Sequence, residues 1–189
     1  MHSLRNRKLI LGSTSVYRRE LLGRLRIPFS VESPHVDEAA LPGETPATLA
    51  QRLALAKARA VAERFPEAVV IGSDLGKPGD HARAVQQLRQ MSGKTVIFQT
   101  AIAVVCLASG FSQEALAPVK VKFRDLSDSE IENYLQAEKP YDCAGSAKSE
   151  GLGIALLERI DNDDPTALVG LPLIRTAALL RAAGIDLLA

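Results

Sequence analysis

The sequence predicts an α/β fold, because short apolar strands end in polar loops and are followed by amphipathic helices. Leu9–Leu11 is expected to end a buried strand, and the helical period of apolar residues begins at Val16. Val69–Gly72 is a second short apolar strand, which ends in Ser73 and Asp74 ahead of another helix. Proteins with this alternation bind their ligands at the carboxyl ends of the strands. We therefore expect the functional site at these strand ends.

The other elements follow from periodicity and capping signals. Thr45 and Pro46 mark the start of a helix that ends at Pro66, and Ser127 with Glu130 forms a capping box that opens another helix. The remaining expected elements are strands at Ile27–Val31, Val96–Leu107 and Val119–Phe123 and helices at His81–Met91 and Ile174–Ala183. The segment 109–118 is expected to be a hairpin loop.

Length and composition narrow the class of protein. With 189 residues, 47% of them apolar and 24% charged, the chain has ample material for the core of one large domain or a two-lobed one. A net charge of +1 argues against a nucleic-acid polymer as partner. No apolar run has the length of a membrane span or the pattern of a secretory signal, and Cys106 is expected to be a buried free thiol. These features favour a cytoplasmic protein without a membrane partner.

The turn Gly12–Ser15 between the first strand and its helix has the chemistry of an anion site. A helix N-terminus presents unpaired N–H groups and the positive end of the helix dipole. Arg18 and Arg19 lie in the first turn of this helix, where cations oppose the dipole unless an anion offsets them. A phosphate would do so. The alternative is a capped helix with two surface arginines.

Four groups of polar residues lie at strand ends or in loops. They are Ser13/Arg18/Arg19, Asp37/Glu38, Ser73/Asp74/Lys77 and Lys148/Glu150. Cations and acids around one cleft suit a polyphosphate held with a divalent ion, with one carboxylate left to orient water. Asp74 is the hardest to explain structurally, because an acid directly after a buried strand needs a partner.

Each of the other groups has a structural alternative. Asp37–Glu38 is also explained by a solvated loop, Lys57 by a helix lysine whose stem covers apolar surface, and Glu150 by a plain surface charge. His2, His35 and His81 share no metal-ligand spacing, so we expect no metal role for them.

Several motifs occur in the same order as in the Maf family of nucleotide pyrophosphatases, which this chain resembles over nearly its whole length. They are GSTSVYRRELL, VDE, LAxAKA, IGSD, GKP, SGKT, CAGSAKSEGLGI and GLPLI. The tyrosine of STSVYRR and the run KSEGLGI resemble the 7-methyl-GTP pyrophosphatase branch. The resemblance implies one Maf-like domain over residues 1–189, with a mixed, strongly twisted sheet, flanking helices and two lobes around a central cleft, as in Maf and ITPase-like proteins. It also implies cytoplasmic hydrolysis of a nucleoside triphosphate to the monophosphate and pyrophosphate, with Mg or Mn as divalent cofactor and often as a homodimer.

The resemblance also implies roles for individual residues. Asp74 matches the catalytic base and, with Glu38, the metal-associated acids. The positions that match phosphate-binding residues are Ser13, Arg18, Lys57 and Lys77, with Arg19 beside them.

Tyr17 and Glu150 fall at positions linked to base selectivity. Methylation at N7 makes guanine cationic, and an aromatic face with a carboxylate favours a cation over its neutral parent. The alternative for Tyr17 is a core aromatic residue at the start of a helix.

The chain departs from the family pattern directly after Asp74. The family continues with a glutamine and a hairpin before GKP, whereas here Leu75 and Gly76 follow at once. Either the deletion is real or the printed chain omits a loop. Two other functions stay open: a dTTP/UTP pyrophosphatase of the same family, against which Tyr17 and Glu150 argue, and a non-catalytic nucleotide-binding or cell-division regulator, which a real deletion would favour.

Overall fold

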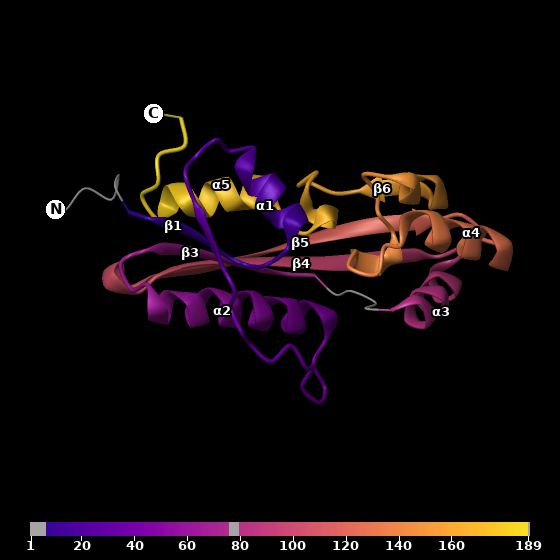
Figure 1. Cartoon of the computed structure of the whole chain (residues 1–189), viewed down its shortest axis with the longest axis horizontal. Helices are drawn as coiled ribbons and strands as arrows, with labels where there is room; N and C mark the ends of the chain where they lie inside the picture. Colours follow the sequence, from indigo (N-terminus) through magenta and orange to yellow (C-terminus); the bar gives the residue numbers. More distant parts are fainter. Residues whose placement is uncertain (1–6, 76–79, 189) are drawn as a thin grey trace.

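A mixed sheet forms the centre of the protein. The computed structural model describes residues 7–75 and 80–188, and in these ranges six strands form one sheet in the order β2-β1-β3-β4-β5-β6 (Figure 1). The strands are β1 (Leu9–Gly12), β2 (Ser30–Glu32), β3 (Val69–Asp74), β4 (Thr95–Cys106), β5 (Phe111–Phe123) and β6 (Leu157–Asp161). β1 pairs in parallel with β2 and β3, and the remaining pairs are antiparallel. The expected mixed sheet is confirmed.

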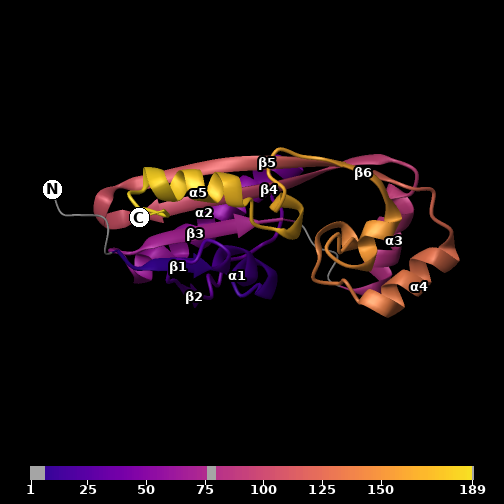
Figure 2. The ribbon, with the colours of Figure 1, turned by 90° about the horizontal axis from the view of Figure 1, so that it is seen from above.

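Helices cover both faces of the β1–β3–β4 part of the sheet. α2 (Pro46–Arg64) lies on one face, and α1 (Val16–Gly23) and α5 (Leu173–Ala182) lie on the other (Figures 1 and 2). Side chains alternate between the faces, so Ile10 packs in the cluster that contains α2, while Leu9 and Leu11 pack in the cluster that contains α1 and α5.

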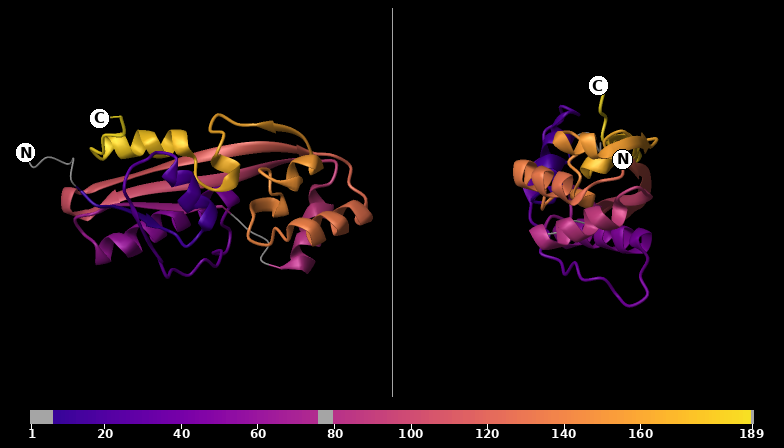
Figure 3. Two further views of the ribbon diagram at one scale, coloured as in Figure 1. Left: turned by 45° about the horizontal axis from the view of Figure 1, so that its top comes forward. Right: turned by 90° about the vertical axis from the view of Figure 1, so that its right-hand side faces the viewer.

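A second packed region surrounds the far end of the β4–β5 hairpin. α3 (His81–Met91) and α4 (Asp128–Glu138) lie there, beside β6 and the short 3₁₀ turns that precede it (Figures 2 and 3). Leu88 of α3, Phe123 of β5 and Leu135 of α4 belong to one buried cluster. β4 and β5 therefore run through both packed regions and join them.

Capping residues fix the starts of the helices as the sequence indicates. Ser15, Thr45, Asp80 and Ser127 each accept a hydrogen bond from a backbone N–H of the first turn. Thr45 and Ser127 form reciprocal capping boxes. Within the described ranges, no helix combines the length and apolarity required to cross a bilayer.

The segment 109–118 is mostly strand, so its assignment as a hairpin loop is wrong. A short 3₁₀ turn, Leu107–Ser109, and Gly110 with φ of 68° reverse the chain, and Cys106 already pairs with Phe111. Ser112, Gln113 and Glu114 are exposed. Their polarity hid the strand. β2 is also shorter than the expected Ile27–Val31.

α2 packs so closely on β3 that Gly72 has no room for a side chain. A Cβ atom at Gly72 would lie 2.1 Å from the carbonyl oxygen of Ala54 and 2.6 Å from the amide nitrogen of Ala58. Gly72→Ala should therefore push α2 away and lower the free energy of unfolding by about 1–3 kcal/mol or more, measured by urea denaturation.

Gly23→Ala is the matched control, because a Cβ atom at Gly23 meets no atom within 4 Å. It should leave the urea midpoint unchanged or raise it slightly. An unchanged midpoint for Gly72→Ala would contradict the close contact between α2 and β3.

Candidate active site

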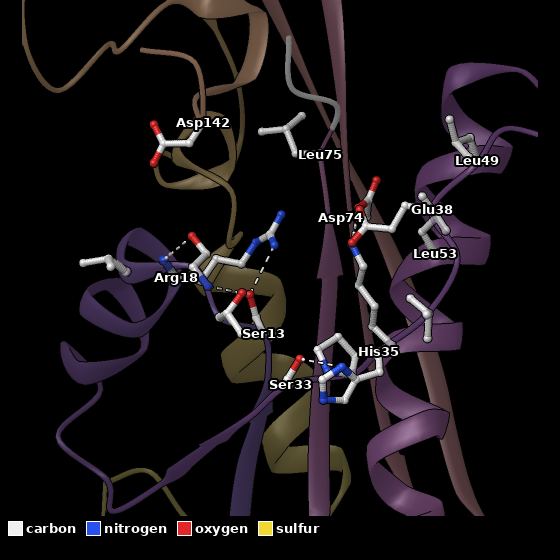
Figure 4. A pocket seen from close by; sticks show the side chains of 16 residues that line it. Ser13, Arg18, Ser33, His35, Glu38, Leu49, Leu53, Asp74, Leu75 and Asp142 are labelled. Atoms are coloured by element: carbon white, nitrogen blue, oxygen red, sulfur yellow. Dashed lines mark hydrogen bonds and ion pairs between the residues drawn. The ribbon is translucent and has the colours of Figure 1, made fainter. Parts of the chain in front are cut away.

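A cleft of about 670 Å³ opens at the carboxyl ends of β1 and β3. Its volume is in the range of small-molecule sites. The β1–α1 turn, the loop after β2, helix α2, the end of β3 and the segment before β6 all contribute to it (Figure 4). The lining residues include Ser13, Ser15, Arg18, His35, Glu38, Leu49, Leu53, Lys57, Asp74, Leu75 and Asp142.

One wall of the cleft carries a buried ion pair. Lys57 Nζ of α2 lies 2.7 Å from Asp74 Oδ1 at the end of β3 and 2.9 Å from Glu38 Oε2 in the loop after β2. The side chains of Lys57 and Asp74 are only 5% and 8% exposed, whereas that of Glu38 is 59% exposed. Removing one partner would leave a buried charge uncompensated, which is costly. The pair thus explains why an acid follows a buried strand.

Arg18 faces the same cleft from the opposite wall. Its side chain is buried, with Nε donating to the carbonyl oxygen of Gly170 at 2.9 Å and Nη1 lying 3.4 Å from Ser13 Oγ. Burial lowers the pKa of Arg18, while the charges of Asp74 and Glu38 act to raise it. No carboxylate of the described residues forms an ion pair with this guanidinium, so its remaining N–H groups suit an anionic ligand.

Three serines hold this wall in place. Ser15 caps α1, and Ser13 Oγ accepts from the Ser15 amide at 3.2 Å. Ser73 Oγ lies 2.8 Å from the carbonyl oxygens of both Ala101 and Gly170, so it ties β3 to the loop that carries the Arg18 acceptor. Ser73 therefore orients Arg18 through Gly170 and does not face the cleft.

A small side pocket opens beside the main cleft. Its walls include Tyr17, Asp142, Cys143 and Glu150, and its volume is about 20 Å³. Burial raises the pKa of Tyr17 above its usual value, and the hydrogen bond to Cys143 and the charges of Asp142 and Glu150 raise it further. Burial also raises the pKa of the Cys143 thiol, to about 11. Cys143 Sγ donates to Asp142 Oδ1 at 3.6 Å.

Glu38 and Asp74 are the carboxylates that could hold a divalent cation in the cleft. Among the described residues, no group of three or more His, Cys, Asp or Glu side chains has the geometry of a complete metal site. Mg²⁺ is nevertheless often bound by one or two carboxylates together with substrate phosphates and water. The two carboxylates converge on Lys57 Nζ, so they fit a cation that arrives with a polyphosphate.

The structure places most, but not all, of the expected site residues around these two hollows. Ser13, Arg18, Glu38, Lys57 and Asp74 line the main cleft, and Tyr17 and Glu150 line the side pocket. Lys77 lies outside the described residues. 

Besides Ser73, three expected polar residues of the described ranges are not brought to either hollow. Arg19 is exposed, Asp37 accepts from the Ala39 amide within its own loop, and Lys148 pairs with Glu138 at 3.2 Å.

The sequence did not indicate several of the residues that line the main cleft and the side pocket. Asp142 lines both hollows; it lies directly before the motif CAGSAKSEGLGI but outside it, so the resemblance gave it no role. Leu75 also lines both, and His35, for which no metal role was expected, lines the main cleft. Gly170, the first residue of the motif GLPLI, contributes a backbone carbonyl, a role that its side-chain chemistry does not indicate; its φ is 119°.

Comparison with known proteins identifies the family. The sequence pattern of the family described as Maf-like protein matches residues 8–183. The chain belongs to this family. The resemblance seen in the ordered motifs is thereby confirmed.

Curated relatives cover nearly the whole chain. A protein of Polaromonas sp. (strain JS666 / ATCC BAA-500), named 7-methyl-GTP pyrophosphatase, is 71% identical over 97% of this chain and 88% of its own length. Proteins with the same name from Albidiferax ferrireducens and Methylobacillus flagellatus are 71% and 53% identical, over 96% and 95% of this chain and 96% and 98% of their own lengths.

The relatives contain residues that this Maf-like chain lacks. The alignment with the Polaromonas protein extends over 193 positions, more than the 189 residues of the chain, although 97% of the chain is aligned. The alignment with the Albidiferax protein extends over 191 positions. Extra residues in the relatives are expected both from a real deletion in this chain and from a loop that the printed chain omits, so both explanations stay open.

Arg18→Gln should weaken the binding of inorganic triphosphate about tenfold or more, because a charge-assisted hydrogen bond contributes about 1.5–3 kcal/mol. Isothermal titration calorimetry measures this loss. Arg19→Gln is the matched comparison, and its effect should be small because Arg19 is exposed outside the cleft. An equal loss of affinity for triphosphate in both variants would show that Arg19 also belongs to the binding site.

Proposed function

We propose that this Maf-like protein hydrolyses 7-methyl-GTP to 7-methyl-GMP and pyrophosphate. The observation that carries the proposal is the pair of buried cations, Arg18 and Lys57, which face one cleft from opposite walls with Asp74 at its edge. Buried cations that converge on open space favour a multiply charged anion. The curated names of relatives with 53–71% identity support the choice of nucleotide.

In this proposal the cationic walls bind the triphosphate. Arg18 is anchored through Nε and donates its outer N–H groups to phosphate oxygens, while Ser13 supports it. Lys57 neutralises charge that develops on the phosphate oxygens as the bond to pyrophosphate breaks. Lys77, outside the described residues, is proposed to do the same by its place in the family pattern.

Asp74 is proposed to orient and deprotonate the attacking water. Its Oδ1 accepts from Lys57, and among the described residues none donates to Oδ2, which can therefore accept from a water. The water oxygen forms a bond to the α-phosphorus, the bond from that phosphorus to the bridging oxygen breaks, pyrophosphate leaves, and the water proton passes to Asp74.

A divalent cation, Mg or Mn, is proposed to bind Glu38 and Asp74 together with the substrate, where it would neutralise charge on the phosphate oxygens.

We further infer that residues 1–189 act as one two-lobed domain in the cytoplasm, without nucleic-acid or membrane partners. The homodimer often found in the family is proposed for this chain too.

A pyrophosphate-release assay across 7-methyl-GTP, GTP, dTTP and UTP tests the proposal. Preference for 7-methyl-GTP is the expected result. Preference for dTTP or UTP would assign the chain to the dTTP/UTP pyrophosphatase branch of the family. Absence of turnover with all four nucleotides would favour a non-catalytic nucleotide-binding regulator.

Asp74→Asn should abolish turnover while nucleotide binding stays within a few-fold of the unchanged protein. The amide keeps the shape of the carboxylate and an acceptor for Lys57, but it is not a base. Single-turnover kinetics and equilibrium binding of 7-methyl-GTP separate the two effects. Loss of binding in step with rate would make Asp74 mainly a metal ligand, and near-normal turnover would refute its role.

Glu150→Gln and Tyr17→Ala should each lower kcat/KM for 7-methyl-GTP more than for GTP. A desolvated cation–π contact is worth roughly 2 kcal/mol, so the ratio should fall about tenfold or more. Glu158→Gln, an exposed glutamate on β6, is the control and should leave the ratio unchanged. Equal losses on both nucleotides would mean that the two residues support the site without reading the base.

A further inference from the structure

The side pocket beside the main cleft is too small for a purine ring. Its volume is about 20 Å³, against about 670 Å³ for the main cleft and several hundred Å³ for typical small-molecule sites. The pocket thus accepts a single group close to the size of water or a methyl. Its walls include the small buried side chains Ala144 and Ala147, which leave this space open, and the thiol of Cys143.

The walls of this pocket carry negative charge. Asp142 and Glu150 both line it, and both act electrostatically on the Tyr17 hydroxyl. Among the described residues that line it, Arg18 is the one cation, and it is anchored to Gly170 and Ser13 on the side of the main cleft. A small group with positive charge would be stabilised between the two carboxylates and the tyrosine ring.

The side pocket and the main cleft can be occupied by one ligand. Ser15, Arg18, Leu75 and Asp142 line both hollows. Figure 4 shows Asp142 and Leu75 at one end of the cleft, beyond Arg18 and Asp74. A nucleotide with its phosphates at Arg18 can therefore reach the mouth of the side pocket with its base.

We propose that the side pocket receives the N7-methyl group of the substrate and that Asp142 is a further specificity-determining residue. The inference rests on the proposed function. The guanine ring stays in the main cleft, and only its methyl group enters between Tyr17, Asp142 and Glu150. The pocket then tests both the size and the charge of the substituent at N7.

This arrangement disfavours unmethylated GTP for two physical reasons. Its N7 is a hydrogen-bond acceptor, which would face two carboxylates. Its ring also leaves the pocket unfilled, so the contacts of a buried methyl group are lost. Larger substituents are excluded by the walls, since one additional methylene in a fitted pocket changes kcat/KM about 10–200-fold.

The test compares kcat/KM for GTP and for its N7-methyl, N7-ethyl and N7-benzyl derivatives. For the unaltered protein we expect an optimum at methyl, with N7-ethyl at least about tenfold lower. Ala147→Val fills the pocket and should reduce kcat/KM for the methyl derivative to about the level of GTP. Cys143→Ala enlarges the pocket and should raise the ratio of N7-ethyl to N7-methyl.

The role of Asp142 has its own variant. Asp142→Asn keeps the size of the pocket but removes a charge, so it should lower the preference for N7-methyl over GTP about tenfold while the optimum stays at methyl. Asp161→Asn, on β6 and outside both hollows, is the matched control and should leave the preference unchanged.

The outcomes separate this inference from the proposed function. Equal rates for the methyl, ethyl and benzyl derivatives would overturn the pocket assignment and leave the pyrophosphatase function standing. An unchanged alkyl series in Cys143→Ala would also overturn it, even if Ala147→Val failed to fold. No turnover of any derivative would refute the proposed function itself.

Discussion

The arrangement of the cleft depends on a buried cation that must have acidic partners. Lys57 is almost fully covered, and its ammonium group reaches Asp74 and Glu38 only because α2 lies very close to the sheet. That closeness requires glycine at Gly72, opposite Ala54 and Ala58. The contact is also tight at Gly12, where a Cβ atom would lie 3.2 Å from the carbonyl oxygen of Lys57. The side-chain-free backbone of β3 thus determines where the charge of α2 is placed.

The two packed regions contribute different chemistry to the site. The region around β1, β3 and α2 supplies the cations and acids of the main cleft, namely Arg18, Lys57, Glu38 and Asp74. The segment between α4 and β6 supplies Asp142, Cys143 and Glu150 to the side pocket. Because β4 and β5 run through both regions, one continuous hairpin connects the parts of the protein that form the main cleft and the side pocket.

Sequence reasoning succeeded where local signals determine the structure. Apolar periodicity and capping residues predicted the bounds of the helices closely. A carboxylate at the end of a buried strand indicated Asp74 as a site residue. It failed where contacts between segments far apart in the sequence determine the structure. Exposed polar residues concealed the start of β5, Lys148 is held by Glu138, and Asp142 reaches the cleft only through the path of the chain around the second region. No pattern along the chain encodes that path.

The β4–β5 hairpin has a consequence for the order of folding. Its strands are joined by a tight turn and pair without a register shift from Cys106–Phe111 to Thr95–Lys122, so each contact lies close to the previous one along the chain. The parallel pair of β1 and β3, in contrast, joins Leu9 to Val69 and must close a long loop first. Because local contacts form faster than distant ones, we expect the hairpin to form early and the cleft, which needs β1, to be completed late. Hydrogen exchange during refolding should protect the amides of β4 before those of β1; the reverse order would contradict this sequence of events.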